Sequence, residues 1–212
     1  CDDNIEDMKN SINLAKDAVL KAEKLSKQIL VYSGRGMVTK SKYSLNQIIE
    51  DFYILLQTTV SKKNQLVINM GNGLPDIYGN ADQIQQILLN LIVNASESIA
   101  SFRDSGGVIT LSTYLTKREE PVPMVGNFNL KIEFTRYVVM DVKDNGKGIK
   151  KKIRERLFEP FNSDKEFGRG MGLASIYGIV KDHRGYIEVE SEEGEGASFR
   201  ILFPLAEDIA KD

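Results

Sequence analysis

The sequence predicts an α+β domain preceded by one long helix, and three observations support this fold class. Residues 4–33 contain neither Gly nor Pro and carry an apolar stripe with helical spacing. Two glycines, at positions 34 and 36, then read as a hinge. Beyond them, helical and strand patterns alternate over a segment long enough to bury one core. We therefore expect one unit at residues 1–36 and a second at residues 37–212.

The first helix carries a seam of the kind found in coiled coils and helical hairpins. Its members are Ile5, Met8, Ile12, Ala15, Val19 and Ala22. A helix of this length with a single apolar stripe needs a partner to cover it. That partner is either the rest of this chain or a separate unit, and the glycine hinge favours the separate unit.

The first half of the α+β domain is expected to hold two helices and a strand. Residues 45–60 place apolar side chains on one helical face, residues 66–70 read as a short strand, and residues 71–75 read as a turn. Asn80 has the residue type of an N-cap, and Gln83 stands where it would complete a capping box. The helix that starts there runs to about residue 100.

The second half is expected to complete the sheet. Strands are predicted at residues 108–115 and 131–142, on either side of an exposed loop at 117–129. A short helix is expected at 151–157, and another at 170–183, with Gly185 at its C-cap. Residues 186–190 and 198–203 form a closing hairpin.

Composition excludes several classes of function. The 28 Lys and Arg against 30 Asp and Glu give a net charge of −2, which argues against a broad nucleic-acid-binding surface. The single cysteine, Cys1, excludes an internal disulfide framework and fits a reducing compartment. No apolar run approaches the ~20 residues that a membrane span requires, and no signal-peptide pattern opens the chain. The single histidine, His183, excludes a zinc site built on several histidines.

Polar residues recur every fourth position along the helix that begins at Asn80. Asp82, Gln86, Asn90 and Asn94 therefore share one face, opposite an apolar face. Asparagine in a helix interior lowers helix propensity. Its amide oxygen suits Mg²⁺, which keeps water and phosphate oxygens as its other ligands. The alternative is a solvated polar face.

A second candidate site follows the apolar strand that ends near Val142. Residues 144–149 read Asp-Asn-Gly-Lys-Gly-Ile. A carboxylate at the end of a strand can accept a hydrogen bond from an exocyclic amine such as that of adenine, and the second glycine permits close approach by a flat ligand. The alternative is a hairpin turn, which an Asn-Gly pair favours.

A third candidate site is the glycine-rich segment 168–172, Gly-Arg-Gly-Met-Gly, just before a helix. Free backbone amides at a helix start form a phosphate cradle, and Lys165 and Arg169 add positive charge. The segment matches neither a P-loop nor a dinucleotide-binding fingerprint, and the motifs of eukaryotic-type kinases are missing. The alternative is an ordinary loop that ends at a helix start.

In this order, the motifs resemble the catalytic ATP-binding domain of sensor histidine kinases. That domain belongs to an ATPase superfamily shared with gyrase, a heat-shock chaperone and mismatch-repair proteins. The resemblance covers about residues 42–205. It rests on an asparagine box at 86–95, a first glycine box at 144–149, a phenylalanine box at 157–161 and a second glycine box at 168–173. Residues 25–33 resemble the second helix of the family's dimerisation and phosphotransfer hairpin.

The resemblance implies a two-layer α/β sandwich with a mixed sheet and with ATP between the helices and the sheet. Asp144 would hold the adenine amino group, and Asn90 would ligate Mg²⁺ with Asn94 beside it. Lys165 or Arg169 would steady the γ-phosphate. The other implied nucleotide-binding residues are those of the glycine boxes, namely Gly146, Gly148, Gly168, Gly170, Gly172 and Leu173.

Three departures from the family pattern concern the nucleotide site. The stretch from residue 161 to 168 is shorter than usual, so the lid is expected to be either small or poorly ordered without partner contacts. Arg169 stands where a small residue is common. Ala197 occupies a position often held by a hydroxyl residue, so a water contact at the adenine site is either lost or taken over by Ser198.

Position 90 distinguishes phosphotransfer from hydrolysis. Hydrolases of the superfamily typically place there a Glu that deprotonates water, whereas Asn90 cannot act as a general base. The resemblance therefore implies a protein-histidine kinase whose acceptor histidine lies on a helix absent from this chain, and His183 is interpreted as structural. Alternatives are a nucleotide-free interaction module and an ATP hydrolase.

The resemblance also implies partners and a location. The expected partners are the missing phosphoacceptor helix, a response-regulator receiver domain and a second copy of the intact protein, with no nucleic acid. The expected location is the cytoplasm, with membrane anchoring of the intact protein left open.

Overall fold

The computed structural model describes residues 40–117, 136–154, 156–159 and 172–209. The chain divides into two compact units, Cys1–Val38 and Thr39–Asp212. The predicted helix at 4–33, the loop at 118–129, the first part of the strand predicted at 131–142, and residues 160–171 lie outside the described residues. Their predicted structures therefore stay predictions.

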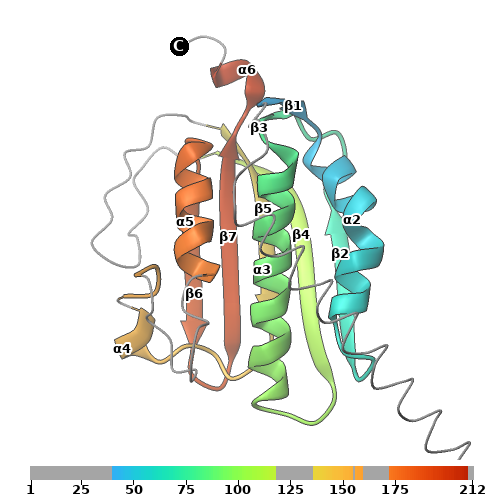
Figure 1. The fold of residues 1–212 in the computed structure, drawn as a ribbon, viewed down its shortest axis with the longest axis vertical. Coiled ribbons are helices and arrows are strands. Elements are labelled where there is room, and N and C mark those ends of the chain that lie inside the picture. The colour runs from blue at the N-terminus through green and yellow to red at the C-terminus, as the bar shows by residue number, and fades with distance from the viewer. Residues whose placement is uncertain (1–39, 118–135, 155, 160–171, 210–212) are drawn as a thin grey trace, which may run out of the picture. The chain divides into compact units, whose positions relative to one another are not determined.

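A five-stranded mixed sheet forms one layer of the second unit (Figure 1). Its strand order is β2-β4-β5-β7-β6, in which β2 and β4 are parallel and every other neighbouring pair is antiparallel. The strands span Asn64–Met70 (β2), Gly107–Lys117 (β4), Arg136–Asp144 (β5), Tyr186–Glu192 (β6) and Gly196–Pro204 (β7). The mixed sheet predicted from the resemblance is confirmed.

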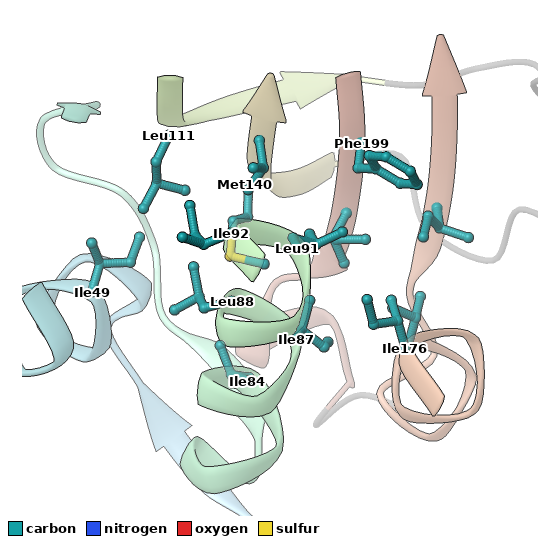
Figure 2. Close-up of a cluster of buried hydrophobic side chains, with 14 of the residues drawn as sticks. Ile49, Ile84, Ile87, Leu88, Leu91, Ile92, Leu111, Met140, Ile176 and Phe199 are labelled. Carbon is teal, nitrogen blue, oxygen red and sulfur yellow. The ribbon is translucent and has the colours of Figure 1, made fainter. Parts of the chain in front are cut away.

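Three helices form the other layer and cover one face of the sheet (Figure 1). They are α2 (Leu45–Thr59), α3 (Ala81–Ala100) and α5 (Gly172–Asp182). The core lies between the two layers, with α3 at its centre (Figure 2). Side chains of α3 that are at most 1% exposed pack toward α2, α5 and the strands, namely Ile84, Ile87, Leu88, Leu91, Ile92 and Ile99. The two-layer sandwich is therefore confirmed.

Four short elements complete the fold. Strand β1 (Ser41–Tyr43) pairs antiparallel with β3 (Ile77–Gly79) in a separate two-stranded sheet. Helix α4 spans Lys151–Arg154, and α6 spans Ala206–Ile209. The sequence pattern revealed neither β1, β3 nor α6, because elements of three or four residues are too short to show a period. It also placed the end of α4 three residues too late, since Arg156–Glu159 follow as turns and a bend.

Helices α2 and α3 begin at capping residues, of which the sequence predicted Asn80. Ser44 caps α2 by accepting a hydrogen bond from the backbone N–H of Gln47, and Asn80 caps α3 by accepting one from the backbone N–H of Gln83 at 3.0 Å. Among the described residues, no helix combines the length and the apolar character that crossing a membrane requires.

Candidate functional site

The candidate site is built along the polar face of α3. Its apolar face is buried as predicted, and Asn90 and Asn94 lie one turn apart on the opposite, partly exposed side. The same four-residue spacing continues in both directions, to Gln86 and to Ser98. At about 1.5 Å per residue, the face from Gln86 to Ser98 is about 18 Å long.

Both ends of this face are tied to other elements. At one end, Gln86 Nε2 donates a hydrogen bond to Ser175 Oγ of α5 at 3.2 Å. At the other end, Ser98 Oγ donates to Asp144 Oδ1 at the end of β5, also at 3.2 Å. The two asparagines lie between these contacts. The fold therefore brings the asparagine box together with the start of α5 and with the first glycine box.

Asn90 carries a buried polar atom without a partner. Its side-chain nitrogen Nδ2 is buried and makes no hydrogen bond within the described part of the chain. A native protein rarely leaves such a donor unsatisfied, so an unpaired one calls for an explanation such as a ligand or an ordered water.

No group of three or more His, Cys, Asp or Glu side chains among the described residues could hold a metal ion.

Asp144 is a buried carboxylate that accepts several hydrogen bonds. It is 4% exposed, and its Oδ1 accepts from the backbone N–H of Gly146 at 2.8 Å and from Ser98 Oγ. Burial raises the pKa of Asp144, while hydrogen bonds from Gly146, Ser98 and the backbone of Ala197 act to lower it. A carboxylate has about four acceptor positions, so three donors leave room for one more.

The two described glycines of the first glycine box are required by contacts within the protein. A Cβ at Gly146 would collide with Ser98 Oγ and with Asp144 Oδ1. Gly148 has a φ of +68°, and a Cβ there would collide with the carbonyl oxygen of Glu192. The sequence-based argument assigned the close approach at the second glycine to a flat ligand, whereas the structure assigns it to the backbone of β6. The nucleotide-binding roles of Gly146 and Gly148 stay predictions.

Further backbone contacts fix the first glycine box in place. The N–H of Lys147 donates to the carbonyl oxygen of Ser98, and the Lys147 carbonyl accepts from Gly194 at 2.7 Å. The N–H of Ile149 donates to Ser191 Oγ at 2.9 Å. The box is therefore held between the end of α3 and the turn that joins β6 to β7.

Helix α5 runs antiparallel to α3. The Gln86–Ser175 contact joins the first turn of α5 to α3, and the last turn of α5 meets the start of α3 through His183 and Asn80. This pairing places Gly172, the first residue of α5, level with the region of Asn90. Leu173 is partly buried and packs on the core. Lys165, Gly168, Arg169 and Gly170 lie outside the described residues, so the phosphate-binding role of the second glycine box stays a prediction.

The described part of the phenylalanine box packs against α5. Leu157 and Phe158 are buried, and the ring of Phe158 lies 5.7 Å from that of Tyr177, centroid to centroid. Aromatic pairs at this separation contribute to packing beyond the area they bury. The box therefore supports the helix that follows the second glycine box.

His183 has the structural role that the sequence predicted, but in an arrangement that it did not predict. The residue is 2% exposed, its Nε2 accepts from the backbone N–H of Asn80 at 3.1 Å, and its Nδ1 lies 2.8 Å from the carbonyl oxygen of Ile179. The ring is therefore the neutral Nδ1–H tautomer. Burial lowers the pKa of His183. In a complete capping box, the side chain of Gln83 would accept a hydrogen bond from the backbone N–H of Asn80. This half of the predicted capping box is wrong, because the Asn80 N–H donates to His183 instead and Gln83 Oε1 is buried without a partner among the described residues.

The side chain of Ser198 faces away from Asp144. Its Oγ donates to Asp141 Oδ1 at 2.7 Å. Asp141 and Asp144 are three residues apart on β5, so their side chains point to opposite faces of the sheet. Ala197 is the residue paired with Asp144 across the β5–β7 ladder. Two outcomes were expected for the hydroxyl contact that Ala197 cannot make, namely its loss or its takeover by Ser198. Only the loss fits this geometry.

Sequence reasoning missed two residues of the site, Ser98 and Ser175. Extending the asparagine stripe by one more interval of four would have reached Ser98. Nothing near Ser175 in the sequence indicates that it meets Gln86, which lies 89 residues earlier.

Comparison with known proteins gives a family match and related sensor kinases. Residues 79–207 match the family described as histidine kinase-, DNA gyrase B-, and HSP90-like ATPase. Sensor kinase CckA of Brucella abortus (strain 2308) is 34% identical over 187 residues, which cover 87% of this chain and 19% of CckA. Sensory histidine kinase/phosphatase NtrB of Rhizobium leguminosarum bv. phaseoli is 28% identical over 96% of this chain and 51% of NtrB. The chain thus spans about a fifth of one of these relatives and about half of the other.

A solved structure with the same fold is that of full-length ShkA in complex with AMPPNP. Its TM-score is 0.62 at 21% sequence identity, over 86% of this chain and 35% of ShkA. At this identity the likeness shows the shared fold.

Proposed function

Because the chain belongs to the histidine kinase-, DNA gyrase B-, and HSP90-like ATPase family, we propose that it is the ATP-binding catalytic portion of a sensor histidine kinase. It transfers the γ-phosphate of Mg-ATP to a histidine on a helix outside this chain. The observation that carries the proposal is the amide face of α3, which lies between the Ser98–Asp144 contact and the Gln86–Ser175 contact. The family match supports ATP as the ligand.

In this proposal, different residues bind the adenine end and the phosphate end of the nucleotide. Asp144 accepts a hydrogen bond from the exocyclic amine of adenine, using the acceptor position that the protein leaves open. Asn90 holds Mg²⁺ through its amide oxygen, and its unpartnered Nδ2 donates to a phosphate oxygen or a bound water. Asn94 lies beside it, and Lys165 and Arg169 neutralise the γ-phosphate.

Phosphotransfer is favoured over hydrolysis by the chemistry of position 90. Phosphoryl transfer depends chiefly on alignment and on charge neutralisation, and bound Mg²⁺ supplies part of that neutralisation. The amide of Asn90 cannot deprotonate a water molecule, so it cannot activate water as the nucleophile. The nucleophile that accepts the phosphate is therefore proposed to be a side chain. In the intact protein we propose a histidine of the dimerisation hairpin as acceptor and a response-regulator receiver domain as the next partner.

Calorimetric titration of this chain with ATP tests the nucleotide site. Binding is expected, and Asp144→Asn should weaken it at least about tenfold, because the carboxylate that pairs with the amine is lost. Asp141→Asn is the matched control, since this carboxylate lies three residues away on the opposite face of the sheet. Equal affinities for the two variants would place adenine elsewhere.

Magnesium is tested by the same titration with and without a chelator. Asn90→Ala should weaken ATP binding more in Mg²⁺ than in chelator, because only the first condition includes the contact of Asn90 with the metal. With γ-labelled ATP, this chain should release little phosphate and carry no acid-labile label. Steady phosphate release that Asn90→Ala abolishes would identify a hydrolase, and the absence of any adenine-nucleotide binding would identify an interaction module.

A further inference from the structure

We propose that Ser98 is a positioning residue that orients the carboxylate of Asp144 for adenine. The inference rests on the proposed function, and it concerns a residue that none of the four boxes contains. Ser98 lies one turn beyond Asn94 on α3, so its hydroxyl faces the same side as the two asparagines.

Two donors converge on one oxygen of Asp144. Ser98 Oγ lies 3.2 Å from Oδ1, and the backbone nitrogen of Gly146 lies 2.8 Å from the same atom. A single donor would leave the buried carboxyl free to pivot about that contact. Two donors from separate elements, α3 and the loop after β5, fix its plane and thereby fix the direction in which its remaining acceptor position points.

Gly146, two residues after Asp144, makes room for this arrangement. A Cβ at position 146 would collide with Ser98 Oγ. The lack of a side chain at Gly146 therefore leaves space for the hydroxyl of Ser98, and both residues donate to the same oxygen of Asp144. The backbone of Ser98 adds a second link, because its carbonyl accepts from the N–H of Lys147.

The hydroxyl also favours the charged form of the carboxylate. Burial is the largest influence on Asp144 and raises its pKa. The hydrogen bonds from Gly146, Ser98 and Ala197 oppose this effect by stabilising the anion. Removal of Ser98 Oγ should therefore raise the pKa of Asp144 further, and the neutral acid is a weaker acceptor for the adenine amine than the anion is.

The experiment measures ADP affinity by calorimetry between pH 5 and pH 8 for four proteins. These are the wild-type chain, Ser98→Ala, Ser98→Thr and the control Ser101→Ala. The control removes an exposed hydroxyl that donates to the backbone carbonyl of Ser98 at 2.9 Å, and it leaves the side-chain hydroxyl of Ser98 in place. Alanine is a good helix former, so the folded state of Ser98→Ala should persist, and thermal unfolding checks that it does.

Ser98→Ala should weaken ADP binding about fivefold at neutral pH, which corresponds to the loss of one ordinary hydrogen bond. Its affinity should also begin to fall at a higher pH than in the wild-type chain. Ser98→Thr should restore both properties, and Ser101→Ala should match the wild-type chain. Unchanged affinity in Ser98→Ala, or weaker affinity with an unshifted pH profile, would overturn the inference. Failure of the wild-type chain to bind ADP would instead overturn the proposed function.

Discussion

The backbone N–H of Asn80 donates to Nε2 of His183 at 3.1 Å, so one hydrogen bond joins the start of α3 to the end of α5. The same ring contacts Phe203 of β7 edge to face, at 5.9 Å between centroids. It also occupies the space that a side chain at Gly79 would need. His183 therefore connects both helices to β3 and β7 at the end of the domain away from Asp144.

Replacing His183 with Leu should lower the free energy of unfolding by about 2 kcal/mol or more. The variant leaves the buried N–H of Asn80 without its acceptor, and an unsatisfied buried donor costs about 1–3 kcal/mol. Urea denaturation followed by circular dichroism measures the change. Lys40→Ala is the control. It removes an exposed hydrogen bond to the carbonyl oxygen of the adjacent Asp182 and a partly exposed ion pair with its carboxylate, so it should change stability by less than about 1 kcal/mol. A His183→Leu variant as stable as the control would contradict this account of the ring.

Stability should fall as the pH drops below about 6.5, the ordinary pKa of histidine. Burial lowers the pKa of His183 in the folded state. Below about pH 6.5, His183 therefore becomes protonated in the unfolded chain while it stays neutral in the folded protein, and this difference favours unfolding. The stabilisation is complete above the unfolded pKa and is lost as the pH falls through the folded one. Urea denaturation at a series of pH values should show a steeper slope between pH 7 and pH 5 for the wild-type chain than for His183→Leu. Parallel slopes would assign the acid sensitivity to other groups.

Two glycine-to-alanine substitutions should change stability in opposite directions. Gly146→Ala places a Cβ against Ser98 and Asp144 and should destabilise the fold by about 1–3 kcal/mol. Gly178→Ala lies in the middle of α5, where a Cβ would meet nothing within 4 Å. It should stabilise the protein by up to about 1 kcal/mol, because glycine is a poor helix former. Thermal unfolding of both variants measures the difference, and a Gly146→Ala protein with wild-type stability would be inconsistent with the close contact at Ser98.

Gln86→Ala should weaken the binding of ATP more than that of ADP. The Gln86–Ser175 hydrogen bond holds the first turn of α5 against α3, at the end of the site where the phosphates are proposed to lie. Its loss should therefore reduce affinity mainly through the γ-phosphate, by about threefold to tenfold. Calorimetry with both nucleotides measures the effect. Gln85→Ala removes the neighbouring amide on another side of the same helix and should leave both affinities unchanged, and an equal loss of ATP and ADP affinity in Gln86→Ala would argue against a role at the phosphate end.

The long elements could be predicted from the sequence because their period is repeated many times. Helix α3 shows its apolar stripe over five turns, and its start is marked by Asn80. Strands β1 and β3 have three residues each, so no period could reveal them. For these short strands, pairing partners distant in the sequence decide the structure.

The sequence was sufficient to identify candidate site residues by their type, but it did not indicate which residues contact them. Asp144 and Asn90 could be identified because a carboxylate after a strand and amides on a helix face suit particular ligands. The partner of Asp144, however, lies 46 residues away on α3, and the acceptor for the N–H of Asn80 lies 103 residues away. Such contacts depend on how the elements are packed together. The same reason explains why the reciprocal half of the predicted capping box was wrong, and why two outcomes had to be left open for the contact at position 197.

The central position of α3 determines how firmly its polar face is held in the domain. Six of its side chains are at most 1% exposed. Those that Figure 2 labels lie among side chains of α2, α5 and the sheet. A shift of α3 would open the core, so its amide protons should exchange with deuterium only when the whole domain unfolds. Helix α5 lies at one side of the helical layer and is joined to α3 by a hydrogen bond near each of its ends (Figure 1). Asn90 and Asn94 thus stand on the element that should open last, and their amides keep their positions whether or not a ligand is bound.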